Sequence, residues 1–484
     1  MKQLIRCFCC CLLLSAAGCS KYLEKVPDNR ALINTPQKIS QLLATAYPQG
    51  NYMAFAEGMS DNITDIGDGG VDRTVSDPYM FADSHENAQD SPENYWFSCY
   101  AAIGAANQAL ASIRASGDSA SYSAQKGEAM VARAYSHFML VNFFAPFYNE
   151  ATAASDPGIP YVTEPETVVI KQYERKTVKY VYDMIEADLL NGMPLIEDKA
   201  YTIPKYHFTK SAANAFAARF YLFKKDYAKV IQYANQSVPA NNFASNLRQW
   251  NTTYTDISDV NQLFNIYAKA TENANILLVE TVSWWARNYY PLRYCMDASI
   301  QSTLFKRPEP LTGGTWAIKL YSVNNNHKLV PKINEYFVRV SVNAETGNGY
   351  VMVPLFTAEE VLFNRAEAYA YTGNSAAALA DLNTYASTRF LNYNASTNNI
   401  TAEKIISYYR TTNIRDGLIR AILDYKRTEF VHEGMRWFDI LRYQIPVTHT
   451  VFGGQTIVLT ANDRRKVLQL PTTVTLSGLA LNPR

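Results

Sequence analysis

Apolar residues recur three and four positions apart along much of this chain, which is the spacing of amphipathic helices. The clearest stretch is residues 210–238, where an alanine-rich pattern of this kind is broken only at Lys225-Asp226-Tyr227. This pattern predicts two helices joined by a tight turn. A second stretch of the same type covers residues 359–387. The chain is therefore expected to contain two helical hairpins of one design.

The two hairpins carry matching residue types at matching positions. Ala218 and Tyr221 of the first correspond to Ala366 and Tyr369 of the second. This pattern of small residue, aromatic residue and turn resembles one tetratricopeptide repeat, a helix pair that buries its apolar face by stacking on its neighbours. Because the copies lie far apart in the sequence, we expect them to belong to one helical scaffold without being consecutive repeats.

Outside these hairpins, four further segments have a helical pattern and one long region lacks it. Further helices are predicted over residues 94–115, 127–144, 177–190 and 418–443. Between about residues 241 and 354 the periodicity is lost, while Asn, Thr, Tyr, Trp and Gly become frequent. Loops held by a rigid frame are where binding residues concentrate. This region, the excursion, is therefore the first place to look for a ligand site.

These patterns predict a mostly α fold. A tetratricopeptide-like scaffold of helical hairpins would cover about residues 30–240 and 355–445, and an irregular, loop-rich, ligand-binding excursion would cover about residues 241–354. No low-complexity linker or charge run divides the chain. We therefore expect one composite domain over residues 19–484.

The first 18 residues have the pattern of a secretion signal, with Lys2 and Arg6 followed by an apolar run and small residues. The run is shorter than the roughly 20 residues needed to span a bilayer as a helix. The segment Ser15-Ala-Ala-Gly-Cys19 resembles a bacterial lipobox. We therefore predict removal of residues 1–18 and attachment of lipid to Cys19, whose two acyl chains would give a stable membrane anchor. An ordinary signal peptide with an incidental Cys19 is the alternative.

Charge and cysteine content narrow the function further. Lys and Arg number 45 against 44 Asp and Glu, so no nucleic-acid partner is expected. Cys99 and Cys295 remain beside Cys19 after removal of the signal, and we expect buried free thiols, although the sequence leaves a disulfide open. No cysteine or histidine spacing indicates a metal site or a cofactor.

Two motifs suggest a metal at first sight. His432-Glu433 could begin a zinc-protease helix, but Arg436 occupies the position of the second histidine. We instead expect a structural helix over residues 418–443 with charged pairs spaced three apart. The expected pairs are Glu433–Arg436, Arg436–Asp439 and Asp439–Arg442.

The second motif is the loop from Asp61 to Asp72, which holds four aspartates and glycines. Several carboxylates in one loop suit calcium, but Ile63 and Ile66 stand where a calcium-binding EF-hand needs a ligand and a glycine. A polar turn is the preferred interpretation, and calcium is the alternative.

Aromatic residues gather at two places. Trp96 lies at the start of a predicted helix, and the segment Ser283–Tyr290 combines indoles, phenols, an amide and a guanidinium. Sugar rings stack their C–H faces on aromatic planes and need polar partners for their hydroxyls. The candidate ligand-binding residues are Trp96, Trp284, Trp285, Arg287, Tyr289, Tyr290 and Trp316. The alternative for each is packing in the local core.

Taken together, the chain resembles the SusD/RagB family of Bacteroidetes nutrient-binding lipoproteins. The most specific match is the closing segment Arg427-Thr-Glu-Phe-Val-His-Glu-Gly-Met-Arg-Trp-Phe-Asp439. The other matches, in chain order, are Cys19 with Tyr22-Leu-Glu24, the helix Tyr100–Asn107, and the helix Ala132–Tyr135 leading into Phe144-Ala-Pro-Phe147. Their order along one chain carries the resemblance.

The resemblance implies a non-catalytic protein that is anchored by lipid to the outer membrane and captures oligosaccharides at the cell surface. It also implies a partner, a SusC-like TonB-dependent transporter that receives the ligand. Three alternatives stay open: a peptide-binding lid on such a transporter, a secreted glycoside hydrolase, and a periplasmic scaffold that binds only proteins. Binding residues vary within the family, so the candidate residues rest on the aromatic argument alone.

Overall fold

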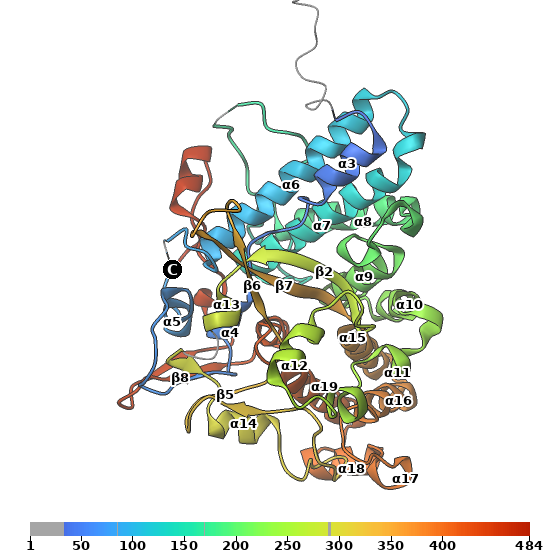
Figure 1. Ribbon diagram of the computed structural model, residues 1–484, viewed down its shortest axis with the longest axis vertical. Coiled ribbons are helices and arrows are strands. Elements are labelled where there is room, and N and C mark those ends of the chain that lie inside the picture. The colour runs from blue at the N-terminus through green and yellow to red at the C-terminus, as the bar shows by residue number, and fades with distance from the viewer. Residues whose placement is uncertain (1–32, 85, 169, 289–291) are drawn as a thin grey trace, which may run out of the picture.

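The computed structural model describes residues 33–484 except 85, 169 and 289–291, and helices make up most of its frame (Figure 1). The longer helices are α6 (Pro92–Ala115), α7 (Ser123–Phe144), α8 (Val178–Gly192), α9 (Lys210–Lys224), α10 (Tyr227–Ser237), α15 (Ala358–Tyr371), α16 (Ser375–Ala386) and α19 (Ile414–Glu429). The shorter ones are α3 (Pro36–Leu43), α4 (Met53–Gly58), α5 (Arg73–Tyr79), α11 (Phe243–Asn246), α12 (Val260–Tyr267), α13 (Trp285–Asn288), α14 (Ala298–Leu304), α17 (Ala395–Asn398), α18 (Ala402–Tyr409) and α20 (Arg436–Arg442). The predicted mostly α fold is confirmed.

Both predicted hairpins are present as α9 with α10 and α15 with α16. Asp226 begins α10 by accepting a hydrogen bond from the Lys229 amide, and Asn374 begins α16 by accepting one from the Ala377 amide. Although they are far apart in the chain, the two hairpins touch, because α10 packs directly against α15. The helix pairs thus stack in the way that the repeat pattern predicted.

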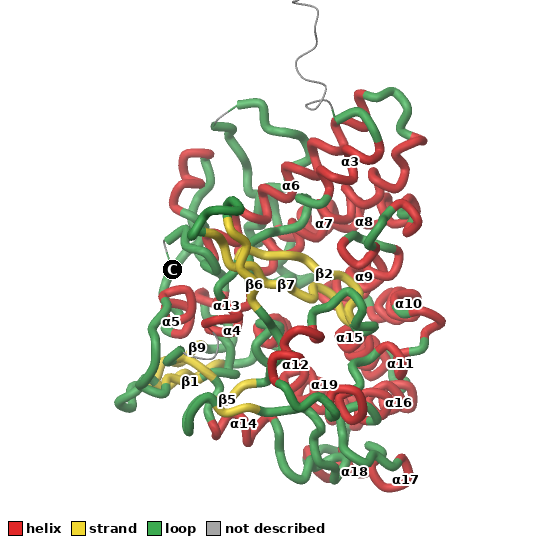
Figure 2. The backbone as a smooth tube through the Cα atoms, viewed as in Figure 1, coloured by secondary structure: helices red, strands yellow, loops and turns green. Residues whose placement is uncertain are grey.

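The excursion is more regular than its sequence suggested. Its centre is an antiparallel sheet in the order β2 (Asn275–Val282), β7 (Gly347–Thr357) and β6 (Glu335–Arg339), drawn in yellow in Figure 2. β7 runs straight into α15, so the sheet is joined rigidly to the scaffold. Two-stranded pairs form between β1 (Thr64–Asp65) and β3 (Tyr294–Cys295), β4 (Tyr321–Ser322) and β5 (Lys328–Leu329), and β8 (Val447–Thr450) and β9 (Thr456–Leu459).

The single helix predicted over residues 418–443 is wrong. The chain leaves α19 after Glu429 and enters α20 at Arg436, and between them His432 and Gly434 adopt left-handed backbone angles. The buried Glu57 carboxylate explains the break, because it accepts hydrogen bonds from the amides of His432 (2.8 Å) and Gly434 (3.1 Å). A helix would direct these amides elsewhere.

The break also changes the expected ion pairs. Of the three, the structure contains Asp439–Arg442, with 3.2 Å between the charged atoms. Glu433 instead pairs with Lys332 at 2.7 Å, and Arg436 pairs with Asp61 at 2.8 Å. Glu433 and Arg436 therefore tie the segment to distant parts of the chain.

Other features of the described chain bear on the earlier expectations. Cys99 and Cys295 are both buried free thiols, as predicted. Cys19 lies outside the described residues. Within residues 33–484 and their stated gaps, no helix has both the length and the apolar character needed to cross a membrane.

Candidate functional site

Among the predicted tryptophans, Trp284 is the one whose side chain is exposed. It comes two residues after the end of β2 and is 44% exposed, while its backbone is held by hydrogen bonds. The Trp284 amide donates to the Asp90 carboxylate at 2.8 Å. The preceding Ser283 hydroxyl accepts a hydrogen bond from the Asn51 side chain at 3.0 Å. The ring therefore stands in solvent on a rigid support.

Asp90 is the main support of this tryptophan. It is buried, has a left-handed backbone (φ 68°), and immediately precedes Ser91, which caps α6. Burial raises the pKa of the Asp90 carboxyl to about 7, even though the Trp284 amide donates to it. The start of α6 and the end of β2 are thus joined through one buried carboxyl group.

Beside Trp284 lies an ion pair whose arginine is half-exposed. The Arg287 guanidinium lies 5.8 Å from the Trp284 ring and pairs with the Glu335 carboxylate, with Nε 2.5 Å from Oε2. Glu335 is the first residue of the edge strand β6. A Cβ at Gly349 would lie 2.5 Å from Glu335 Oε1, so the absence of a side chain there makes room for the pair.

Phe337 completes this surface and was missed in the sequence. It lies two residues after Glu335 in β6, so its side chain leaves the same face of the sheet. Its side chain is 51% exposed. The aromatic and β-branched run Tyr336-Phe-Val338 is a strand signal that could have indicated it. We call Trp284, Arg287, Glu335 and Phe337 the tryptophan surface.

Two of the predicted residues lie in the core. Trp285 is 2% exposed, and its indole N–H donates to the carbonyl oxygen of His432 at 2.9 Å. Trp316 is 4% exposed and packs on Phe390, with ring centres 4.5 Å apart. Both rings are packed in the core, and their binding role stays a prediction. Tyr289 and Tyr290 lie outside the described residues.

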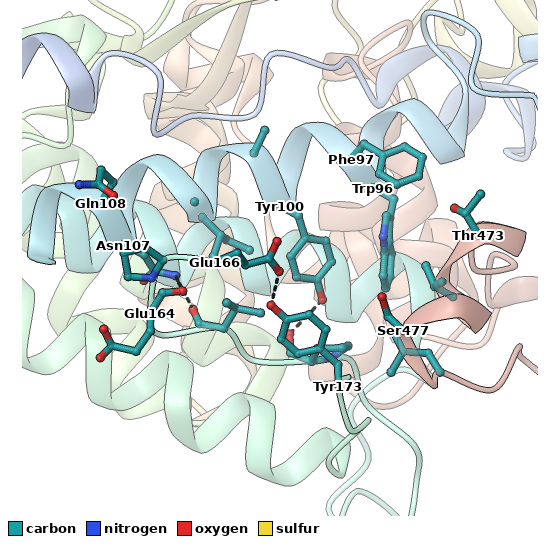
Figure 3. A pocket seen from close by; sticks show the side chains of 18 residues that line it. Trp96, Phe97, Tyr100, Asn107, Gln108, Glu164, Glu166, Tyr173, Thr473 and Ser477 are labelled. Atoms are coloured by element: carbon teal, nitrogen blue, oxygen red, sulfur yellow. Dashed lines mark hydrogen bonds between the residues drawn. The ribbon is translucent and has the colours of Figure 1, made fainter. Parts of the chain in front are cut away.

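Trp96 lines a separate cavity of about 570 Å³ along α6 (Figure 3). Tyr100 and Tyr173 line the same cavity, where the Tyr173 hydroxyl donates to the Glu166 carboxylate. Trp96 is itself 3% exposed and packs edge to face on Phe144, so most of its area stabilises the core. The binding role of Trp96 stays a prediction.

Three of the four aspartates of the loop 61–72 are engaged by other partners. Asp65 pairs with Arg293 at 2.5 Å, Asp61 pairs with Arg436, and Asp72 caps α5 by accepting from the Thr74 amide. The arginines hold the pKa of both Asp61 and Asp65 low, against the effect of burial. In the described part of the chain no three metal-ligating side chains converge. The loop fits a polar turn tied by arginines.

Comparisons with known proteins agree with this architecture. A family model described as "Starch-binding associating with outer membrane" matches residues 21–222, and one described as "SusD family" matches residues 322–467. No curated protein matches the chain.

Solved structures match over nearly the whole chain. A SusD superfamily protein from Bacteroides fragilis is 20% identical with a TM-score of 0.69, covering 92% of this chain and 99% of its own. One from Bacteroides thetaiotaomicron is 18% identical with a TM-score of 0.67, covering 93% and 100%. A laminarin-binding SusD-like protein is 16% identical with a TM-score of 0.58, covering 93% and 99%. At these identities the likeness establishes the fold.

Proposed function

The chain belongs to the SusD/RagB family, and from this premise we propose that it captures oligosaccharides at the cell surface and delivers them to a SusC-like TonB-dependent transporter, without catalysing a reaction. The family is one of carbohydrate-binding proteins associated with the outer membrane. The proposal adds the site, the anchor and the partner for this chain.

The exposed Trp284 ring is the observation that carries the proposal. A half-exposed indole costs hydrophobic free energy unless a ligand covers it, and it offers a flat surface for the C–H face of a sugar. Beside it, Arg287 supplies hydrogen-bond donors and Glu335 supplies acceptors, which hydroxyl groups require. Phe337 offers a second exposed ring on the same face of β6.

The proposed anchor is lipid on Cys19 after removal of residues 1–18, with the protein exposed at the cell surface. Its test is Cys19→Ala, which should move the protein from the membrane fraction to the soluble fraction. A protein that stays in the membrane fraction after this change would contradict lipid anchoring, while leaving ligand binding to be judged separately.

Ligand binding is tested by isothermal titration of the mature chain from residue 20, without lipid, against host and plant oligosaccharides and mixed peptides. We expect saturable heat with one glycan class and its loss in Trp284→Ala. The matched control is Tyr180→Ala, which removes an aromatic residue of similar exposure (40%) from α8. Unchanged glycan binding in Trp284→Ala would exclude the tryptophan surface as the site.

Peptide binding is the second candidate, favoured by the edge strand β6. Among the described residues no strand pairs with its outer edge, and Phe337 and Val338 are exposed along it. An extended peptide could pair with such an edge through its backbone. A response to peptides that survives Trp284→Ala would favour this function, whereas release of reducing ends from a polysaccharide would indicate a hydrolase.

A further inference from the structure

A second and larger cavity lies on the other face of the three-stranded sheet. Its volume is about 1050 Å³, and its walls are α3, residues 200–207 and one face of the sheet. Glu335 and Tyr336 are neighbours in β6, so their side chains leave opposite faces. Glu335 belongs to the tryptophan surface, whereas Tyr336 lines this cavity. The two sites therefore share a sheet but not a face.

The base of the cavity is a cluster of rings around a buried carboxylate. Glu128 of α7 is fully buried and accepts hydrogen bonds from the Tyr47 hydroxyl and from His207 Nδ1, each at 2.7 Å. The Tyr201 ring stacks on His207 with centres 4.4 Å apart. Because His207 Nδ1 is hydrogen-bonded to Glu128, Nε2 is the ring nitrogen with which His207 can bind a ligand in the cavity.

The wall formed by the sheet repeats this combination of rings and oxygen atoms. The Tyr336 hydroxyl donates to the exposed Glu280 carboxylate on β2, and the Tyr336 ring stacks on Tyr350 with centres 5.8 Å apart. Tyr206 lines the cavity as well and lies near enough to help raise the pKa of Tyr336, after burial and Glu280. The Glu280 carboxylate is thus held by the Tyr336 hydroxyl, and the Tyr206 phenol lies close to that hydroxyl.

The charges of the lining decide which ligand fits. None of the described residues that line the cavity is a lysine or an arginine, and Glu280 would repel an anion. Exposed Gln37, Gln41 and Gln49 supply amides that can both donate and accept. The volume lies at the upper end of small-molecule sites, about 300–1000 Å³, and gives room for more than one sugar ring.

We propose that this cavity is a second saccharide site, which takes neutral sugars and rejects sugars that carry carboxylate or sulfate groups. The inference rests on the proposed glycan-binding function but not on the tryptophan surface. A long neutral glycan or two separate chains would then contact both faces of the sheet.

The test is isothermal titration of the mature chain with short neutral oligosaccharides of glucose, mannose and galactose, beside oligosaccharides of the matching uronic acids. The variants are Trp284→Ala for the first site, Tyr206→Ala and Tyr336→Ala for the second, and Tyr180→Ala as control. Tyr336→Phe keeps the ring and removes only the hydroxyl that orients Glu280. Thermal unfolding checks that each variant is folded.

We expect Trp284→Ala to keep a neutral-sugar site that Tyr206→Ala and Tyr336→Ala each weaken about tenfold or more, as loss of one stacking ring predicts. Glu280→Gln should allow uronic acids to bind. Binding that Trp284→Ala abolishes and Tyr206→Ala leaves unchanged would overturn the second site while keeping the proposed function. Binding unaffected by Trp284→Ala but lost in Tyr206→Ala would support the cavity and overturn the tryptophan surface. No binding to any sugar would overturn both.

Discussion

The helical scaffold and the excursion differ in how well the local sequence pattern predicts whether a side chain is buried. In α10 the buried residues are Val230, Ala234 and Ser237, which lie four and three positions apart, as helical spacing predicts. In the excursion, Trp284 and Trp285 are adjacent, yet one is 44% exposed and the other 2%. In the scaffold, the spacing of apolar residues therefore predicts which side chains are buried. In the excursion, only the tertiary structure shows which ring is exposed and which is buried.

The two regions are nevertheless joined by a buried network of charges. Arg389, which follows α16, contacts Glu429 of α19 and Glu359 of α15, each at 2.9 Å. Glu359 also pairs with Arg248 of the excursion at 2.9 Å. All four side chains are at most 1% exposed. Burial opposes ionisation of Glu429, but the Arg389 guanidinium holds its pKa below the usual value.

Breaking this network should have the largest effect on the protein. Arg389→Ala leaves the buried Glu429 carboxylate without its guanidinium partner, and removal of one partner of a buried pair costs about 3–5 kcal/mol. We expect a loss of that order in the free energy of unfolding, measured by urea denaturation. The control is Arg114→Ala, which breaks an exposed pair with Glu164 and should cost about 1 kcal/mol or less. Equal losses in the two variants would contradict the role of burial.

The two adjacent tryptophans should separate stability from binding. Trp285→Ala removes a buried ring and its hydrogen bond to His432, so we expect it to destabilise the protein by about 3–5 kcal/mol. Trp284→Ala should change the unfolding free energy by about 0.5 kcal/mol or less and still abolish glycan binding. Urea denaturation and titration of the same two variants check this. A similar loss of stability in both would remove the contrast between the regions.

The sequence predicted the scaffold because its information there is local. Helical spacing, the caps Asp226 and Asn374, and the matched alanines and tyrosines all act within a few residues of each other. It missed the sheet because the register of β2 with β7 joins residues such as Glu280 and Met352, far apart in the chain. It missed the break before Arg436 because the cause is Glu57, which no local pattern indicates.

The candidate site was only partly predictable for the same reason. The aromatic density around residue 284 correctly drew attention to an exposed indole, but composition alone treated Trp284, Trp285 and Trp316 alike. Phe337 comes to the same face as Glu335 only through the pairing of β6 with β7. A sequence shows which residue types could form such a site, but which of them come together depends on strand pairing.

Asp90 should give a pH dependence to the junction between α6 and Trp284. Its carboxyl is neutral in the folded protein up to about pH 7, whereas it ionises near its ordinary pKa of 3.8 when unfolded. Its contribution to stability is therefore fully present below about pH 4 and is lost as the pH rises through 7. Relative to Asp90→Asn, the wild type should lose on the order of 1 kcal/mol or more across this interval. Denaturation curves at pH 4 to 8 measure it, and parallel profiles for the two proteins would contradict it.

The smallest expected effect compares the two scaffold hairpins. Lys225 ends α9 in a left-handed conformation (φ 61°) with an exposed side chain, whereas the corresponding turn after α15 has Gly373 (φ 81°). A left-handed residue with a side chain is strained by about 1–2 kcal/mol. Glycine relieves this strain, but it loses more conformational entropy on folding, which offsets part of the gain. Lys225→Gly should therefore stabilise the protein by about 0.5–1 kcal/mol, and Gly373→Ala should destabilise it by about 1 kcal/mol. Urea denaturation of both variants measures these changes. A loss of stability in both variants would contradict the prediction and would mean that the two turns, unlike the helices they join, do not follow one design.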